Sequence, residues 1–566
     1  TGTVIDKSTR TPLLGVTVQS KKGITTTDSV GRFSINADIG DMLQFSFVGM
    51  KPAGIQIAAA SDNLLVEMES GGGDLNQVVV IGYTTQRKQD LTGAVAVVDL
   101  SPVKNNSSGN TMQALQGRVA GLYIEKDGSP NGSNGRILIR GANTLGNNDP
   151  LYVIDGIPTT RPEVFQNMDP ATIASVQVLK DASAESIYGA RASNGVIIVT
   201  TKNGGNTNGK VNFQLNSSIS SQSEKAMRFT MLNSVDRGKA LWQASVNDGQ
   251  NPAAGYGEIY GFDWNNDYAN PVLNSVTVKP FVGGDPNTPA GNTDWQSVMY
   301  KTGLVSNNSF TVSAGNKNSS LEVNLGYLKN TGMLRYTGYN RLSGSINALT
   351  RAFKDKVLFG VNLRMANSNE TLTARDLGGA STTFLAVTLA PTIPVYQTDG
   401  ITYAGELGAG YSDRNNPLHM QDLAKWNNAN RLSTFGNVFA EIQPIKNLFF
   451  KSNFGADDAR FLNKIITPTF TEGALSRTTN SLFFDQNHYL STTFSNTLRY
   501  NLNLGDDNHF KFLAGTEYIK TNIDFQQTKK EGYALQTEDY FTLNAGTGNT
   551  TVAGGSTGNS LFSQFA

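Results

Sequence analysis

The sequence contains no cysteine in its 566 residues. Disulfide bonds, thiol catalysis and thiolate metal sites are therefore excluded. An excess of charge of either sign is also lacking, since 46 basic side chains balance 46 acidic ones, which argues against a nucleic-acid partner. Histidine is scarce, and the three present are far apart along the chain: His419, His488 and His509. We expect no metal, no other cofactor and no catalytic site, because neither a ligand pair nor a nucleophile motif occurs.

Long apolar runs are missing as well. The longest, residues 78–81 and 196–199, are far shorter than the roughly 18 residues that a membrane helix needs. A membrane barrel stays possible, because its strands need only about ten residues of alternating character. The chain starts at Thr1 without an initiator methionine or a signal peptide, which suggests a processed or partial product.

The first 70 residues alternate short β-prone runs with turns. This spacing predicts a small β-sandwich with strands near residues 15–19, 31–35, 42–47 and 64–68. Residues 71–89 follow as a separate segment. It begins with glycines typical of a linker, and the isolated β-prone strip 75–83 comes next. This strip can either pair inside the fold as an ordinary strand or add a strand to the sheet edge of another protein, and its position favours the second use.

Residues 90–205 mix strands, short helices and glycine-rich loops, which predicts a compact α/β domain. Asp155-Gly156 lies between two apolar runs and predicts a hairpin, because both turn positions favour positive φ. A strand is expected at 176–179, then a short helix capped by Asp181 and reaching Tyr188, and a strand at 196–201.

From about residue 206 to 566 apolar and polar residues alternate with a period of two, as in Leu321, Val323 and Leu325 around Glu322 and Asn324. The connections alternate in length. Short turns are expected at 316–318, 352–356, 444–447 and 503–509; long segments are expected at 222–308, 330–339, 368–430, 457–487 and 523–559. Such asymmetry is typical of an outer-membrane barrel, with short periplasmic turns and long extracellular loops.

The alternating region provides about ten strands, the last near residues 560–566, whereas large plugged barrels have about 22 strands. An open edge in lipid would leave backbone groups unpaired, at a cost of several kcal/mol each. We therefore expect the native chain to continue beyond Ala566. The predicted fold is a partial all-β membrane barrel of the 22-stranded type, with an α/β plug domain and an N-terminal β-sandwich.

Three blocks of the sequence resemble the SusC/RagA family of TonB-dependent transporters. They are residues 112–122, residues 137–141 with 150–158, and residues 178–202. The first 50 residues resemble the carboxypeptidase-regulatory-like domain, and residues 293–315 resemble the family's early barrel strands. The resemblance implies import of large nutrients, glycan or oligopeptide fragments, across the bacterial outer membrane, with the N-terminal domain in the periplasm and the long loops outside.

The resemblance also implies partners. Residues 77–83 resemble the Ton box, so the expected binders of TonB, which works with ExbB and ExbD, are Val78, Val79, Val80, Ile81, Gly82 and Tyr83. A SusD/RagB-like surface lipoprotein is the expected lid, with dimerisation of transporter–lid pairs as a further expectation. Arg140 resembles a plug arginine that pairs with barrel acids; the alternative is an ordinary surface arginine.

Candidate contacts to the substrate or the lid lie in two places. The outer plug loops, 142–149 and 159–168, carry polar groups suited to hydroxyl or peptide ligands, namely Asn143, Asn147, Asn148, Asp149 and Arg161. The alternative is that these are ordinary solvated loops. The first long loop carries an aromatic group that contains Trp242, Tyr260 and Trp264. These rings suit stacking on sugars or anchoring a lid, and the alternative is packing within the loop.

Three other functions fit parts of the pattern. A siderophore or cobalamin receptor would share the plug and the barrel. A β-rich surface adhesin would share the sandwich and the loops but would need neither a plug nor a Ton box. A secreted enzyme has no positive support in the sequence.

Overall fold

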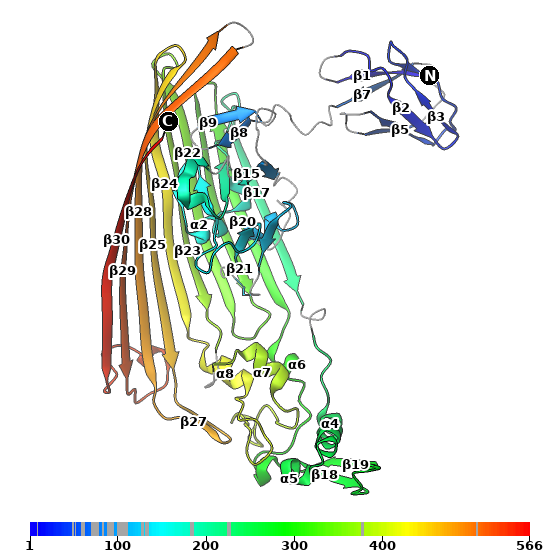
Figure 1. The fold of residues 1–566 in the computed structure, drawn as a ribbon, viewed down its shortest axis with the longest axis vertical. Helices are drawn as coiled ribbons and strands as arrows, with labels where there is room; N and C mark the ends of the chain where they lie inside the picture. The colour runs from blue at the N-terminus through cyan, green and yellow to red at the C-terminus, as the bar shows by residue number, and fades with distance from the viewer. Residues whose placement is uncertain are drawn as a thin grey trace. The chain divides into compact units, whose positions relative to one another are not determined.

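The structure is a computed structural model. It describes residues 1–7, 10–47, 50, 52–57, 63–69, 78–81, 84–87, 95–98, 111–125, 129–130, 135–180, 186–223, 228–374, 379–504 and 508–565. The chain divides into two compact units, Thr1–Ala94 and Val95–Ala566 (Figure 1).

The first unit contains a β-sandwich of two sheets. One sheet has the order β4-β1-β7 and the other β3-β2-β5-β6. Alternate residues of each strand point inward, so that Leu43 and Phe45 are buried on β5 while Met42 and Gln44 between them are exposed. The strands are β1 (Gly2–Asp6), β2 (Thr17–Ser20), β3 (Gly23–Thr26), β4 (Arg32–Phe33), β5 (Met42–Ser46), β6 (Ala53–Gln56) and β7 (Leu64–Met68). The predicted sandwich is confirmed.

A separate hairpin follows in the same unit. Strand β8 (Val78–Ile81) pairs antiparallel with β9 (Thr84–Arg87).

The second unit begins with an α/β region, called the plug below, whose central sheet has the order β10-β15-β16-β13-β14. Asp155 and Gly156 adopt φ of 49° and 86° in the turn between β13 and β14, so the predicted hairpin forms. The predicted helix from Asp181 begins outside the described residues. The elements of the plug are β10 (Val95–Val98), α1 (Thr111–Leu115), β11 (Leu122–Ile124), β12 (Ile137–Ile139), β13 (Leu151–Ile154), β14 (Ile157–Thr159), α2 (Pro162–Gln166), η3 (Pro170–Thr172), β15 (Ile173–Leu179), η4 (Ser186–Ala192) and β16 (Val196–Thr201).

A ten-stranded antiparallel sheet forms the rest of the framework, and its strands are neighbours in sequence order. They are β17 (Val211–Gln222), β20 (Gly303–Gly315), β21 (Ser319–Thr331), β22 (Gly338–Ala352), β23 (Val357–Thr371), β24 (Asn428–Ile445), β25 (Leu448–Thr467), β28 (Ser481–Leu504), β29 (Asn508–Glu531) and β30 (Thr550–Phe565). β28 and β29 have 24 residues each, which corresponds to about 80 Å of extended chain.

Short and long connections alternate as predicted, but several strands are longer than predicted. Residues 457–467 continue β25, whereas the sequence predicts a loop there. The loop is predicted because Asp457, Asp458 and Arg460 interrupt the apolar alternation. β30 likewise starts at Thr550 instead of near residue 560, since its first half is rich in glycine and threonine.

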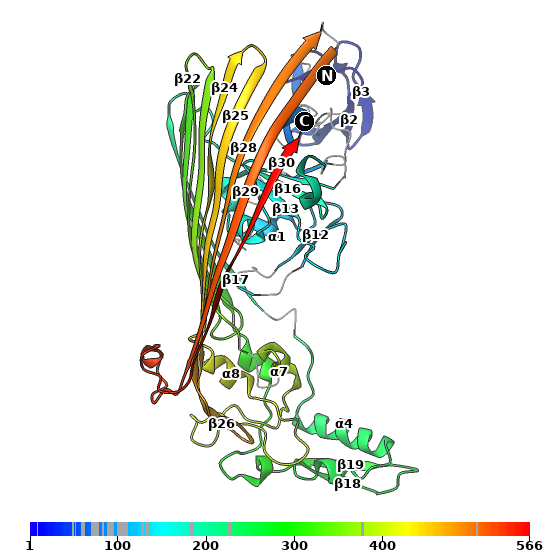
Figure 2. The same ribbon diagram turned by 60° about the vertical axis from the view of Figure 1, so that its left-hand side comes forward.

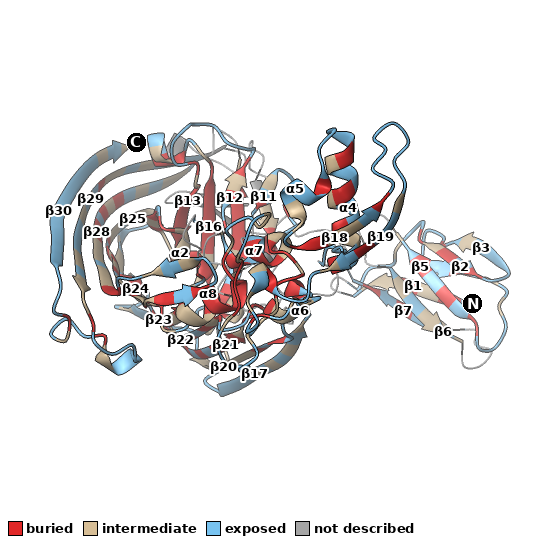
Figure 3. Ribbon diagram, turned by 90° about the horizontal axis from the view of Figure 1, so that it is seen from below, coloured by how far each residue is buried: buried red, intermediate tan, exposed pale blue. Residues whose placement is uncertain are grey.

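The two faces of the large sheet differ in polarity. On the outer face, Val438, Phe454, Phe494, Tyr518 and Phe562 are direct cross-strand neighbours, and each is between 43% and 61% exposed. The next row along the strands faces inward and is polar and buried: Asn453, Ser495 and Glu517. An apolar outer face over a polar inner face is the pattern of a wall in lipid. Figure 3 shows buried residues concentrated in the plug strands such as β13 and β16.

The long connections at one end of the sheet carry their own small elements (Figure 2). A cluster of buried apolar residues that includes Trp295, Leu389, Ile393 and Leu418 packs three of the helices together. The elements are α4 (Ser234–Asn247), α5 (Pro252–Tyr256), β18 (Tyr260–Trp264), β19 (Leu273–Val278), η6 (Val282–Gly284), α6 (Trp295–Met299), α7 (Thr382–Thr388), α8 (Pro417–Leu423), β26 (Phe470–Glu472), β27 (Leu475–Arg477) and η7 (Glu538–Tyr540). In the described part of the chain, no helix combines the length and the apolar character that crossing a membrane requires.

Candidate functional site: the interface between plug and sheet

The turn of the plug hairpin is bonded to the wall. Asp155 forms an ion pair with Arg364 of β23, and both side chains are 9% exposed. Thr201 at the end of β16 joins them: its backbone N–H and its hydroxyl donate to Asp155 at 2.9 and 2.8 Å, and its Oγ1 accepts from Arg364 at 2.8 Å. Arg364 thereby ties together two plug strands that are separate in sequence.

The end of β14 makes a second polar anchor. The Thr159 hydroxyl donates to Asp457 Oδ2 at 2.8 Å, and Arg161 donates to Asp457 Oδ1 at 2.5 Å. The Arg161 guanidinium also lies 5.4 Å from the Phe461 ring centre and 5.1 Å from that of Tyr489. Asp457 is 2% exposed, so it relies on these partners for the hydrogen bonds that water would otherwise supply.

A third ion pair lies further along the sheet. Arg191 of the plug contacts Glu517 of β29 at 2.6 Å, and the Glu517 side chain is 2% exposed. Removing one member of such a pair leaves the other charge buried without compensation, which is strongly destabilising. The three pairs therefore fix the position of the plug on the wall.

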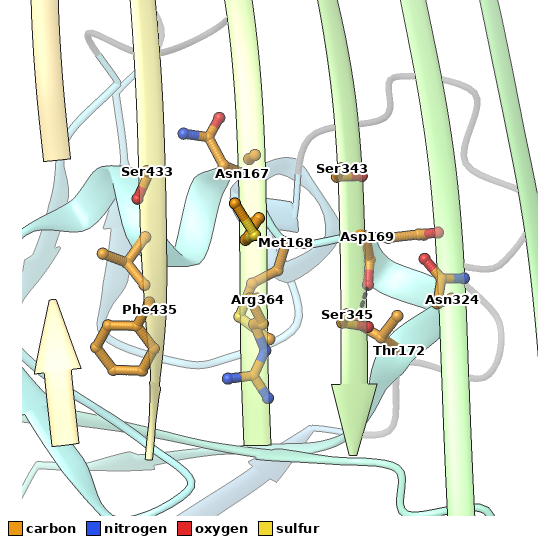
Figure 4. A pocket seen from close by; sticks show the side chains of 14 residues that line it. Asn167, Met168, Asp169, Thr172, Asn324, Ser343, Ser345, Arg364, Ser433 and Phe435 are labelled. Atoms are coloured by element: carbon orange, nitrogen blue, oxygen red, sulfur yellow. Dashed lines mark hydrogen bonds between the residues drawn. The ribbon is translucent and has the colours of Figure 1, made fainter. Parts of the chain in front are cut away.

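Close packing accompanies the polar contacts. Phe435 of β24 is part of the plug's apolar core. A Cβ built on Gly455 would lie 2.5 Å from Ile157 Cδ1, so any larger residue there would require Ile157 to move. A cavity of about 30 Å³, large enough for one water, remains beside Asp169 and Arg364. Figure 4 shows Arg364, Ser345, Asn324 and Phe435 on neighbouring strands, with Asp169 and Thr172 of the plug beside them.

Known protein families match two parts of the chain. The model of the TonB-dependent receptor plug domain matches residues 87–196. The model of the CarboxypepD_reg-like domain matches residues 1–80.

Curated relatives match across a larger part. TonB-dependent receptor SusC from Bacteroides thetaiotaomicron is 31% identical over 409 residues, which cover 70% of this chain and 36% of the relative. TonB-dependent receptor P26 from Formosa agariphila is 27% identical over 542 residues, which cover 94% of this chain and 50% of the relative. The chain belongs to the SusC/RagA-type TonB-dependent receptors. It is accordingly a receptor of the outer membrane, and its ten-stranded sheet is part of the receptor barrel.

A solved structure agrees with this assignment. The RagAB peptide importer in its open-open state has a TM-score of 0.65 and 25% sequence identity, and the match covers 86% of this chain and 53% of that one. The receptor chain spans about half the length of the curated relatives it matches, between 36% and 50%.

The predicted Ton box lies partly within the described residues. Val78, Val79, Val80 and Ile81 form β8 of the hairpin with β9. Gly82 and Tyr83 lie outside the described residues.

Arg140 lies at the end of β12 of the receptor plug with a φ of 60° and is exposed. Its backbone N–H donates to Gly121 O at 2.9 Å. Within the described ranges no ion pair of its side chain with the sheet is present, so its contact with the barrel stays a prediction. Ion pairs with the sheet are made by Asp155, Arg161 and Arg191, none of which carries a local signal of that role.

The polar residues of the outer plug loop mostly organise the loop itself. Asn148 is 8% exposed, accepts from the backbone N–H groups of Asn143 and Thr144 at 2.7 and 2.8 Å, and donates to Thr144 O. Asn147 accepts from the Asp149 N–H at 2.9 Å. Arg161, predicted beside them as a ligand contact, is buried against Asp457 instead.

The aromatic residues of the first long loop pack together. Trp242 and Trp264 are 5% and 8% exposed and meet edge to face with ring centres 5.9 Å apart. Tyr260 is 1% exposed. Their burial favours the packing interpretation of this group, and direct contact with a ligand stays a prediction. Trp264 also contacts the more exposed Tyr268, at 5.2 Å.

A histidine–carboxylate contact links two other loops of the receptor, and sequence spacing gave no sign of it. His419 of α8 bonds to Glu472 of β26 and stacks on Tyr403 with ring centres 4.4 Å apart. Glu472 also accepts from the Asn416 N–H at 2.6 Å. Nearby, Glu406 accepts from the N–H groups of Ser412 and Arg414, and burial raises the pKa of Glu406. In the described ranges, no cluster of His, Asp and Glu suited to a metal ion occurs.

Proposed function

We propose that this receptor takes part in TonB-dependent import of large nutrients, glycan or oligopeptide fragments, across the outer membrane. The observation that carries the proposal is the plug bonded by two buried ion pairs and one half-buried ion pair to the polar inner face of an apolar-faced wall. Such an arrangement suits a stopper that has to be displaced by work, since breaking each pair costs energy. An adhesin would have no use for it.

The energy would enter through the Ton box. Val78 to Tyr83 would pair with TonB by strand addition, which relies on backbone hydrogen bonds. Because Val78–Ile81 already pairs with β9, capture by TonB would exchange β9 for the partner strand. Domain boundaries follow the same proposal: residues 1–70 form the sandwich, 71–89 the linker and Ton box, 90–205 the plug and 206–566 the barrel part.

A SusD/RagB-like surface lipoprotein is the proposed lid over the long loops. The similar RagAB structure is described as a peptide importer, which supports a peptide cargo, while a glycan cargo is proposed on the sequence resemblance. Arg140, the outer plug loop and the Trp242 group are candidate secondary contacts within this proposal.

The Ton box provides the test. Val79→Pro removes a backbone donor and blocks strand addition, whereas Val79→Thr keeps the backbone intact and serves as the matched control. We expect the proline variant to reach the outer membrane in normal amounts and to lose growth on the imported nutrient, while the threonine variant keeps it. Normal uptake by the proline variant would refute TonB-driven import through this chain.

A further inference from the structure

A patch of ordered polar and aromatic side chains lies on the inner face of the wall beyond Asp457. Three successive cross-strand rows on β25, β28 and β29 share the face of Asp457, because side chains alternate along each strand. The rows are Ala459–Tyr489–Ile523, Phe461–Asn487–Phe525 and Asn463–Asp485–Gln527. We call these nine residues the wall patch.

Asp485 organises the polar part of the wall patch. Its carboxylate accepts hydrogen bonds from Asn463 Nδ2 at 3.1 Å, Asn487 Nδ2 at 3.2 Å and Gln527 Nε2 at 3.2 Å. All four side chains remain partly exposed. Each amide therefore has one N–H bonded to Asp485, and a side-chain amide has a second N–H and a carbonyl oxygen with which it can bind a ligand.

The aromatic part of the wall patch touches the plug. Phe461 and Tyr489 hold the Arg161 guanidinium of the plug, and Phe461 also lies 5.3 Å from the guanidinium of Arg431. Phe525 is free of these cations and is 39% exposed. The amide row thus lies beside rings that contact the plug's second anchor.

We propose that the wall patch is a subsite for an uncharged, hydroxyl-rich ligand, namely a segment of an oligosaccharide. This inference rests on the proposed import function. Planar amides that present a donor and an acceptor side by side match neighbouring hydroxyl groups, each of which both donates and accepts. An exposed ring such as Phe525 offers an apolar face to the C–H side of a sugar.

Peptide recognition fits the wall patch less well. β25, β28 and β29 each pair with neighbours on both sides, so no backbone edge remains there for a peptide strand to join. Two of the charges within reach are already engaged, Asp485 by three amides and Arg161 by Asp457, while the guanidinium of Arg431 lies against the Phe461 ring. A ligand that occupies the patch would also contact Tyr489, whose ring lies against the Arg161 guanidinium of the plug.

The test is direct binding to the whole receptor in detergent, measured by calorimetry. The probes are neutral oligosaccharides of about six units, one each of the glucan, mannan, xylan, galactan and fructan types, and a pool of peptides of similar length. The variants are Asn487→Leu and Asp485→Leu. The control is Gln486→Leu, at an exposed position on the opposite face of the same strand.

We expect at least one oligosaccharide to bind, and both patch variants to weaken it about tenfold or more, while the control binds normally. The proposal is overturned if none of the oligosaccharides binds, if the patch variants bind them unchanged, or if only peptide binding is weakened. Its failure is distinguishable from that of the import function. If Val79→Pro loses uptake while Asn487→Leu binds glycan normally, the subsite proposal is refuted and the import proposal stands. If Asn487→Leu binds glycan more weakly while Val79→Pro keeps normal uptake, the proposal of TonB-driven import is refuted and the subsite proposal stands.

Discussion

Asp155 of the plug and Arg364 of the wall share Thr201 as a hydrogen-bond partner, although Asp155 and Arg364 are 209 positions apart in the sequence. The three groups form a closed triangle at the turn of the plug hairpin. The first prediction concerns this triangle.

Replacing Arg364 by methionine leaves Asp155 buried without its cation. We expect a loss of stability of about 3 kcal/mol, seen as a lower melting temperature of the whole receptor in detergent and as faster proteolysis of the plug. Arg351→Met is the matched control, since Arg351 is exposed at the end of β22. Adding Asp155→Asn to the Arg364→Met variant should restore part of the loss. An unchanged melting temperature in Arg364→Met would contradict the anchoring role.

The second prediction concerns Thr159. Thr159→Val keeps the size of the side chain but removes the hydroxyl that donates to Asp457 and accepts from the Arg161 N–H. We expect a loss of about 1–3 kcal/mol, because a buried carboxylate loses a donor. Thr159→Ser retains the hydroxyl and should melt close to the wild type. Equal melting of the valine and serine variants would show that the hydroxyl does not matter.

The third prediction uses the tight fit of the plug hairpin at Gly455. Gly455→Ala places a methyl group against Ile157, so the hairpin has to shift. We expect destabilisation of about 1–3 kcal/mol and easier proteolysis of the plug. Ile157→Ala makes room for the methyl group, so the double variant should be more stable than the sum of the two single effects predicts. Strict additivity of the two changes would argue against direct contact.

The fourth prediction is a pH dependence of the extracellular loops. Burial raises the pKa of Glu406 in the folded receptor above its ordinary value of 4.5. The folded state then holds a proton that the unfolded state releases, so stability falls as pH rises from about 4.5 through the raised pKa. Glu406→Gln removes this titration. We expect the melting temperature of the wild type, relative to that of the glutamine variant, to decline across this window, and parallel curves for the two proteins would disprove it.

Local features of the structure were predictable from the sequence. The Asp155-Gly156 turn, the short turns at 316–318, 352–356 and 444–447 and the alternation of the strands depend on neighbouring residues only. The centre of the turn predicted at 503–509 lies outside the described residues. The resemblance of whole blocks to a known family then supplied the arrangement of sandwich, plug and barrel. Neither the hairpin turn nor the alternation required knowledge of distant contacts.

Long-range polar contacts were not predictable. Thr159 and Asp457 are 298 positions apart, and an acid within a strand does not reveal its partner. Asp457 and Asp458 even suggested a loop, because charges in a soluble strand usually face water. Here Asp457 lies on the polar inner face that the plug covers, and Asp458 lies on the outer face, 3.0 Å from His488. The aromatic group around Trp242 was equally ambiguous, since packing and ligand binding use the same residue types.

β28 and β29 are longer than strands need to be to cross a bilayer. Tilted by about 40°, strands of about 80 Å rise about 60 Å, more than twice the ~25 Å apolar band of an outer-membrane barrel. Arg460, His488 and Asp524 form a row of polar and charged side chains on the outward side of these strands, where lipid would be unfavourable. The strands therefore extend well beyond the apolar band, and the long loops lie outside the bilayer. The connections at that end can therefore change in sequence while the part of the wall that faces lipid stays unchanged.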